Sequence, residues 1–295
     1  MPQQHNPEHS RTNERAQSRF AYFGTPNVAS ETLTTLIEHN IVPGVVITAP
    51  DAPRDRGHVL TQSPTKTLAL SHGIRVLTPA RLDTEALAEI RACNCEYAVV
   101  VAYGKIFPEE LINAFPLGVL NVHYSLLPKY RGATPLEAAL LSNEKETGVT
   151  IQKMVKELDA GDIIAQKATD IAPTETAREL RPRLIALGAD MLVETLPLYV
   201  EGFVTPIAQD ASKATRSGKL KKEDGLLLLD APAQQNWNKY RAYTDSIGTY
   251  FFENGKRIKI IKASFAPLPA GKTGGKFIIE RVIPEGKREM DYAKN

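Results

Sequence analysis

The sequence contains only two cysteines, Cys93 and Cys95, and this scarcity excludes two ways of holding a fold together. Two thiols cannot build a disulfide framework, and a single C-x-C pair falls short of the four ligands of a structural zinc site. No run of 18 or more apolar residues occurs either, so no transmembrane helix is expected. The first 19 residues lack the apolar core of a secretory signal peptide. These absences together predict a soluble, cytoplasmic protein.

Three common catalytic signatures are missing as well. The first apolar run ends in FGTPN (23–27), which has one glycine where a dinucleotide-binding loop would follow the pattern G-x-G-x-x-G. Neither the phosphate-binding pattern G-x-x-x-x-G-K-[ST] nor the G-x-S-x-G turn of serine hydrolases occurs. The sequence therefore gives no support to a dinucleotide site, a P-loop or a nucleophilic serine of this kind.

What the chain does have is an ordinary globular composition with an uneven distribution of charge. Its 295 residues are 42% apolar and 24% charged, which allows one large domain or two unequal ones. Residues 206–295 contain 17 Lys and Arg against 10 Asp and Glu, a balance of +7, whereas residues 1–205 carry −5. A separate module that faces a polyanion and a solvated surface with random charge drift explain this split equally well.

The order of predicted elements indicates a two-part fold. Strand-like and helix-like segments alternate from Phe20 to about residue 142, which is typical of a mostly parallel sheet covered on both faces. Two further strands and a long helix follow, and then a basic stretch. Beyond it, short strands and the Asn-Gly turn of ENGK (253–256) predict a small β domain. We thus expect a disordered tail (1–19), an α/β domain with Rossmann-like topology (20–205), a basic linker (206–222) and an OB-like β-barrel (223–295).

Asn121 and His123 stand two residues apart at the end of a predicted strand, so both side chains leave the same face of the sheet. Open α/β sheets bind ligands beyond the carboxyl ends of their strands, which makes this position a candidate site. The alternative is a hydrogen-bonded core histidine beside a turn-capping asparagine. Asp159, in the turn LDAGD (158–162), is on its own interpreted as a turn aspartate that accepts backbone N–H groups.

Longer motifs add a family resemblance to these separate signals. The chain resembles the formyltransferases that use 10-formyltetrahydrofolate, through the segments NVHYSLLPKYRG (121–132), TGVTI (147–151) and LDAGDI (158–163). It is most similar to the members that act on methionyl-tRNA, because it shares with them FGTPNVAS (23–30), the APDAP…RG…SP segment (49–64), VVVAYGKIFP (99–108) and KLKKEDG (219–225). The resemblance extends from about Phe20 to Phe265 and implies a formyltransferase domain followed by the small β-barrel.

The resemblance implies an activity and three catalytic residues. The activity is formyl transfer from 10-formyltetrahydrofolate to the α-amine of methionyl-initiator tRNA for translation initiation, with an amino sugar nucleotide or another small amine as the alternative acceptor. Asn121 would donate an N–H to the tetrahedral oxyanion, and His123 would donate to the same oxygen and help to move the proton. Asp159 would stabilise the imidazolium, fix its tautomer or take the amine proton through water, and the sequence leaves these roles open. No metal ion is required.

Substrate-binding residues follow from the same resemblance. The folate co-substrate is expected to contact Ser125, Leu126, Leu127, Pro128, Val100, Val101, Ala102 and Tyr103. The tRNA is expected to contact the linker and a long structureless loop at 50–64, through Arg54, Arg56, Lys213, Arg216, Lys219, Lys221 and Lys222. We expect a monomer without membrane contact. In one departure, Tyr124 stands where the family usually has glycine, which is expected either to narrow the approach of the folate or to make the strand edge less mobile.

Overall fold

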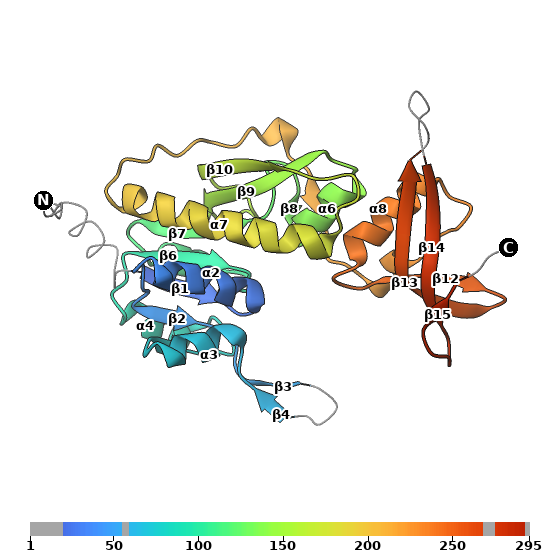
Figure 1. Cartoon of the computed structure of the whole chain (residues 1–295). Coiled ribbons are helices and arrows are strands. Elements are labelled where there is room, and N and C mark those ends of the chain that lie inside the picture. Colours follow the sequence, from blue (N-terminus) through green and yellow to red (C-terminus); the bar gives the residue numbers. More distant parts are fainter. Residues whose placement is uncertain (1–19, 55–58, 268–274, 293–295) are drawn as a thin grey trace, which may run out of the picture. The chain divides into compact units, whose positions relative to one another are not determined.

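The computed structural model describes residues 20–54, 59–267 and 275–292 (Figure 1). The chain forms two compact units, and each is assembled from segments that are apart in the sequence. The first unit comprises Met1–Pro128, Val149–Lys167 and Leu184–Ala214, and the second comprises Lys129–Gly148, Ala168–Arg183 and Thr215–Asn295. The tail 1–19, predicted to be disordered, lies outside the described residues.

A seven-stranded sheet with the strand order β10-β9-β7-β6-β1-β2-β5 forms the centre of the α/β part (Figure 1). The mostly parallel sheet is confirmed, because five of its strands run parallel: β1 (Phe20–Gly24), β2 (Val45–Ile47), β5 (Arg75–Leu77), β6 (Tyr97–Val101) and β7 (Gly118–His123). β9 (Glu146–Lys153) runs antiparallel to β7, and β10 (Ile163–Asp170) is an edge strand. The chain leaves β1 towards β2 and returns on its other side as β6. The neighbouring ends of β1 and β6 are therefore the switch point at which such sheets bind ligands.

The α/β part contains the helices α2 (Asn27–Glu38), α3 (Pro64–Ser71), α4 (Thr84–Arg91), α5 (Glu109–Ile112) and α7 (Ala177–Val200). Two of them begin at a side-chain cap, which satisfies an N–H group that the first helical turn leaves open. Ser63 Oγ accepts from the Lys66 N–H at 3.0 Å, and Asp83 Oδ1 accepts from the Ala86 N–H at 3.2 Å. Because both faces of the sheet are covered, the central strands FAYFG and YAVVV are continuous apolar runs and fully buried.

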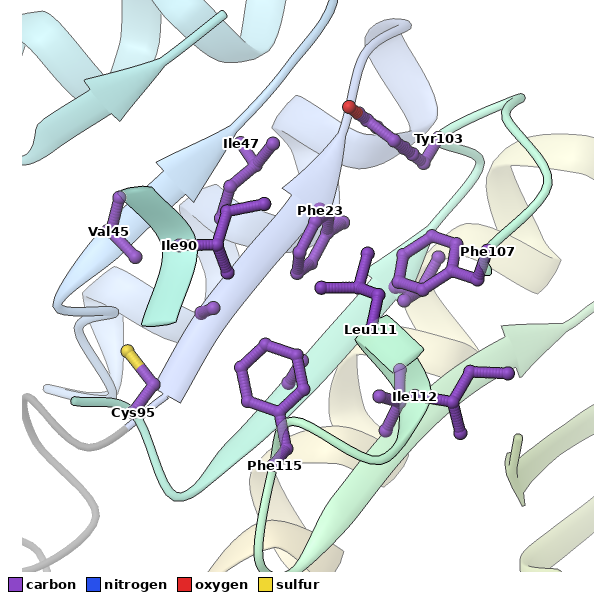
Figure 2. Close-up of a cluster of buried hydrophobic side chains, with 14 of the residues drawn as sticks. Phe23, Val45, Ile47, Ile90, Cys95, Tyr103, Phe107, Leu111, Ile112 and Phe115 are labelled. Atoms are coloured by element: carbon purple, nitrogen blue, oxygen red, sulfur yellow. The ribbon is translucent and has the colours of Figure 1, made fainter. Parts of the chain in front are cut away.

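An apolar core on one face of the sheet supports the end of β6. Figure 2 shows Phe23 among side chains of β2, α4 and α5. The Phe23 ring meets those of Tyr103, Phe107 and Phe115 edge-on, with centroids 5.4, 4.9 and 6.3 Å away. Edge-to-face pairs stabilise beyond the burial of their surface. The aromatic cluster thus anchors the loop that follows β6 at Tyr103 and Phe107.

The segment 50–64 is not the structureless loop that its Pro, Gly and charged residues predict. It contains a short antiparallel hairpin of β3 (Ala52–Arg54) and β4 (Val59–Thr61). An ion pair between Lys66 Nζ and Asp51 Oδ1 at 2.7 Å holds its base. The pairing supplies the backbone hydrogen bonds that a structureless segment would leave to water.

The second unit contains the predicted β domain as an antiparallel sheet in the order β12-β13-β14-β15. Its strands are β12 (Thr249–Glu253), β13 (Lys256–Pro267), β14 (Gly275–Pro284) and β15 (Met290–Asp291). The predicted Asn-Gly turn joins β12 to β13, with φ of 50° at Asn254 and 73° at Gly255, as a tight hairpin turn requires. Side chains connect the two edge strands, since Tyr292 donates to Glu253 Oε1 at 3.1 Å and its ring packs on Phe251. The sheet is thereby curled towards closure.

Helix α8 (Ala233–Tyr243) joins this sheet to α6 (Pro135–Leu141) within the second unit. Arg241 is fully buried and donates from Nη2 to the Leu140 carbonyl at 3.3 Å and to Asn143 Oδ1 at 3.0 Å. The indole of Trp237 donates to the Pro173 carbonyl at 3.1 Å. These bonds provide acceptors for the donor groups of two buried side chains, Arg241 and Trp237.

The basic stretch predicted as a linker (206–222) contains short regular pieces. A 3-10 turn spans Ala211–Lys213, and β11 (Arg216–Ser217) pairs in parallel with β8 (Arg131–Gly132). Next to this ladder, the Thr134 hydroxyl donates to the Gly218 carbonyl at 2.7 Å. Residues 215–218 are thereby tied to residues 130–134 of the same unit. Among the described residues, no helix has the length and apolarity needed to cross a membrane.

Candidate active site

Asn121 and His123 lie on one face of β7, as their spacing predicts. The register places Asn121 between Val100 of β6 and Gln152 of β9, and it places His123 opposite Thr150. Cross-strand partners project from the same face of a sheet, so the Gln152 side chain lies beside that of Asn121. Two amides and an imidazole therefore meet near the carboxyl end of β7.

Asp159 belongs to the same cluster, although 36 sequence positions separate it from His123. Its Oδ2 lies 3.7 Å from His123 Nδ1, and only 6% of the His123 side chain and 11% of the Asp159 side chain are exposed. This distance is longer than a hydrogen bond and suits an ion pair when the imidazole is protonated. Burial strengthens that attraction, because little water screens the two groups. The structure thus brings the three predicted catalytic residues together.

Two glutamines that the sequence analysis did not single out hold Asp159 in place. Gln152 donates from Nε2 to Asp159 Oδ1 at 2.8 Å. Gln209 donates from Nε2 to the carbonyls of Asp159 and Gly161, at 2.9 and 2.7 Å. Gln152 could have been found from its place opposite Asn121 in a β7–β9 ladder. Gln209 follows α7 and carries no sequence signal that connects it to Asp159.

The turn that carries Asp159 is tight enough to require a glycine. Asp159 itself adopts the left-handed conformation, with φ of 50°. Two residues later, a Cβ on Gly161 would lie 1.7 Å from the Lys153 carbonyl oxygen. Only glycine permits this close approach, which lets the turn fold back so that Asp159 meets β7 and β9.

The predicted folate segment Ser125–Pro128 follows β7 and is fixed by two side chains. The Thr150 hydroxyl donates to the Ser125 carbonyl at 2.7 Å and accepts from the Leu127 N–H at 3.1 Å. Gln166 donates from Nε2 to the Leu127 carbonyl at 2.9 Å and to Thr150 Oγ1 at 2.8 Å. Ser125 and Leu127 are buried, whereas Leu126 and Pro128 are half-buried. The latter two can form an apolar wall for a ligand.

The predicted folate residues at the end of β6 differ in accessibility. Val100 and Val101 are buried in the sheet, whereas Ala102 is exposed and has φ of 47°. The Tyr103 hydroxyl is buried without a hydrogen-bond partner in the described part of the chain, and burial raises the pKa of Tyr103 to about 12. An unpaired donor beside exposed main chain at the switch point suits a polar planar ring such as a pterin.

Tyr124 does not narrow the side of the sheet that carries Asn121 and His123. Its ring packs at Gly188 of α7, where an added Cβ would lie 3.5 Å from Tyr124 Cε1 and 3.1 Å from Val122 Cγ1. Val122 and Tyr124 alternate with Asn121 and His123 along the strand and therefore face the opposite side. Tyr124 therefore does not obstruct the folate on the face that carries Asn121 and His123.

The predicted tRNA-binding residues are distributed over both units. Arg54 ends β3, and Arg56 lies outside the described residues. Lys213 belongs to the first unit, where its Nζ pairs with Asp210 Oδ2 at 3.4 Å. The remaining four belong to the second unit and are exposed: Arg216, Lys219, Lys221 and Lys222.

Two family models match the chain. Residues 18–196 match "Formyl transferase", and residues 219–282 match "Formyl transferase, C-terminal domain". Among similar sequences, methionyl-tRNA formyltransferase of Carboxydothermus hydrogenoformans is 42% identical over 92% of this chain and 89% of its own length. The enzyme of that name from Lactobacillus johnsonii is 39% identical over 93% of each chain.

Solved structures share the fold at lower identity. An N-formyltransferase from Helicobacter canadensis, solved with folinic acid and dTDP-3-aminofucose, aligns with a TM-score of 0.68 at 20% identity, covering 89% of this chain and 99% of that one. Methionyl-tRNA formyltransferase from Clostridium thermocellum aligns with a TM-score of 0.58 at 16% identity, with the same coverage. Both likenesses confirm the architecture of an α/β domain followed by a β domain.

The turn geometry predicts that Gly161→Ala destabilises the protein by about 1–3 kcal/mol, because the new methyl group forces the main chain apart at Lys153. Gly218→Ala is the matched control, since a Cβ there meets nothing within 4 Å and should change stability by less than about 0.5 kcal/mol. Urea unfolding followed by circular dichroism measures both. Equal stability of the two variants would contradict the close approach.

Proposed function

This chain belongs to the formyl transferase family, and from that premise we propose that it transfers the formyl group of 10-formyltetrahydrofolate to the α-amine of methionyl-initiator tRNA, for translation initiation. The observation that carries the proposal is the buried cluster of Asn121, His123 and Asp159 at the end of β7. Relatives of about 40% identity over most of the chain support methionyl-tRNA as the acceptor. Solved sugar formyltransferases, at about 20% identity, support the fold alone.

The reaction is acyl transfer to an amine. The amine nitrogen attacks the formyl carbon, and the electron pair of the C=O bond moves to the oxygen. Asn121 Nδ2 and the protonated His123 imidazole donate hydrogen bonds to this oxyanion. The amine then loses a proton, the bond from the formyl carbon to N10 of the folate breaks, and N10 takes up a proton. Binding alone would not need this donor set, because its groups act on charge that develops during the reaction.

Asp159 supports His123 electrostatically. A carboxylate 3.7 Å from the imidazole favours the protonated ring, which is the form that donates to the oxyanion. Its other oxygen accepts from Gln152 and is therefore fixed in direction. The amine proton passes to the pair formed by Asp159 and His123, directly or through water, once the tetrahedral species has formed.

The folate fits the groups at the switch point. Its pterin ring has N–H and carbonyl groups on one edge, which match the exposed main chain at Ala102 and the buried Tyr103 hydroxyl. Leu126 and Pro128 supply apolar surface for the aminobenzoyl part, on a segment whose main chain is fixed by Thr150 and Gln166. Val100 and Val101 contribute through their main chain, since their side chains are buried in the sheet.

The tRNA meets the chain through its backbone and its acceptor end. We assign the catalytic role to residues 20–205, a basic linker to 206–222 and general tRNA binding to the β domain 223–295, which together with the linker carries the basic excess. Exposed Lys219, Lys221 and Lys222 offer charge without base-specific geometry, as phosphate contacts require. The β3–β4 hairpin, with Arg54 and Arg56, is assigned to the acceptor end.

The direct test offers the purified chain 10-formyltetrahydrofolate with either charged initiator tRNA or a dTDP-amino sugar. Formyl-methionyl-tRNA is the expected product. Formylation of the sugar nucleotide without formylation of the tRNA would replace the proposed acceptor, and no formyl transfer to either amine would overturn the function.

Replacing any member of the cluster should lower kcat far more than it weakens folate binding. Asn121→Ala removes an oxyanion donor, and the loss of one such donor typically costs about 10²–10³ in rate. His123→Ala and Asp159→Asn should cost at least as much, and their effects should not multiply, because the groups act together. Single-turnover rates and the folate Kd measure both quantities. Near-normal turnover in His123→Ala would contradict the assignment.

Removing charge from the linker should weaken all tRNAs alike. Each phosphate that the protein no longer neutralises lowers the slope of log Kobs against log salt by about 0.7–0.9. Combined substitution of Lys219, Lys221 and Lys222 by Ala should therefore flatten the salt dependence for initiator and elongator tRNA equally. Lys167→Ala, an exposed lysine on β10, is the control. A wild-type slope in the triple variant would show that the basic tract is only a solvated surface.

A further inference from the structure

We propose that Gln152 is a positioning residue of the reaction, whose amide holds the Asp159 carboxylate in the orientation that serves His123. The proposal rests on the formyl transfer proposed above. Gln152 lies on β9 and is 1% exposed, and it touches the predicted catalytic cluster at two of its three members. It is opposite Asn121 in the ladder and donates to Asp159 Oδ1 at 2.8 Å.

The chemistry of the pair fixes which end of the amide faces the carboxylate. An ionised carboxylate only accepts hydrogen bonds, so the NH2 end of Gln152 must point towards Asp159. The Oε1 end then points away. This oxygen is buried and has no hydrogen-bond partner in the described part of the chain.

A buried acceptor without a partner is unfavourable, and an apolar side chain of the same length would avoid it. The Gln152 side chain is itself 1% exposed, so it fills buried space that an apolar side chain of the same length could also fill. Packing therefore does not explain a glutamine here. The hydrogen bond to Asp159 does, because it is the one contact that only the amide can make.

The hydrogen bond from Gln152 fixes the orientation of the Asp159 carboxylate. With Oδ1 bound to Gln152, the carboxylate plane is fixed and Oδ2 is the oxygen that faces His123 at 3.7 Å. The main chain of the same residue is held separately by Gln209. Gln152 thus orients the Asp159 side chain, and Gln209 holds the main chain of the turn. A substitution of Gln152 should therefore affect the chemistry without loosening the turn.

Several charged groups around Asp159 lie in the described part of the chain. His123 is the titratable group that faces it from β7. On its own turn, Glu157 and Asp162 are exposed, and Lys156 pairs through Nζ with Glu109 Oε2 of α5 at 3.0 Å. A change at Gln152 should therefore be seen in the pH dependence of the step that uses Asp159 and His123.

The test compares Gln152→Met, which keeps length and loses the amide, with Gln152→Glu, which places a second carboxyl beside Asp159. Gln152→Met should lower kcat about 10- to 100-fold and leave both KM values within about twofold, as expected when a reacting group is misplaced. The acid limb of its kcat profile should move to higher pH, because the carboxylate loses a donor. In Gln152→Glu it should move further, because adjacent carboxyls resist ionising together.

Coupling to Asp159 supplies the second readout. In the Asp159→Ala background, Gln152→Met should cost less than about twofold, because the oxygen that accepts its hydrogen bond is already gone. Gln166→Met is the contrast variant, since that amide binds the Leu127 carbonyl, and it should raise the folate KM without moving the pH profile. Circular dichroism establishes that each variant is folded.

Wild-type formylation of methionyl-tRNA in the same assay decides the proposed function, and the variants decide the role of Gln152. If the wild type is active and Gln152→Met keeps normal kcat, the inference fails alone. It also fails if the two substitutions multiply, or if the pH profiles of the wild type, Gln152→Met and Gln152→Glu coincide.

Discussion

The burial of one carboxylate beside one imidazole is the constraint on which the rest of the candidate site depends. An ionised group that leaves water is strongly unfavourable unless its oxygens are paired. Asp159 meets this requirement through His123 and Gln152. The left-handed backbone of Asp159, the glycine at 161 and the amide of Gln209 all serve to bring that carboxylate to the sheet. These three features of the structure thus have a common physical cause.

Strand β9 connects this cluster to the neighbouring segment. Its residues Thr150 and Gln152 are two positions apart and face the same side of the sheet, and each supports a different segment. Gln152 supports Asp159, and Thr150 fixes the main chain of Ser125 and Leu127. A single strand therefore sets the distance between the predicted acid–base groups and the predicted folate segment. Loops alone would not hold such a distance, since they are the more mobile parts of a fold.

Much of the fold could be predicted from the sequence, because local pattern and tertiary packing agree there. Asn121 and His123 lie at the end of a strand, β7, as predicted, and the Asn-Gly turn of the β domain lies where its residues require. The β3–β4 hairpin was missed, since Pro and Gly in a charged segment give no alternating pattern. Strand alternation alone predicts that Tyr124 faces away from Asn121 and His123. The resemblance, with glycine usual at this position, predicted an obstruction instead. Gln209 could not be found, because its bonds to the Asp159 turn are set by tertiary structure.

The discontinuous make-up of the two compact units bears on how such a chain can be altered by recombination. The gap between the two matched family models lies at 197–218, but the packing does not divide there. Lys129–Gly148 and Ala168–Arg183 belong to the unit that contains the β domain, through α6 against α8 and through the Trp237–Pro173 bond. A crossover at the gap would join a foreign β domain to segments shaped for the original one. The segments matched by the two family models and the two compact units of the fold therefore have different borders. Exchange of the C-terminal domain requires matched changes in the middle of the sequence.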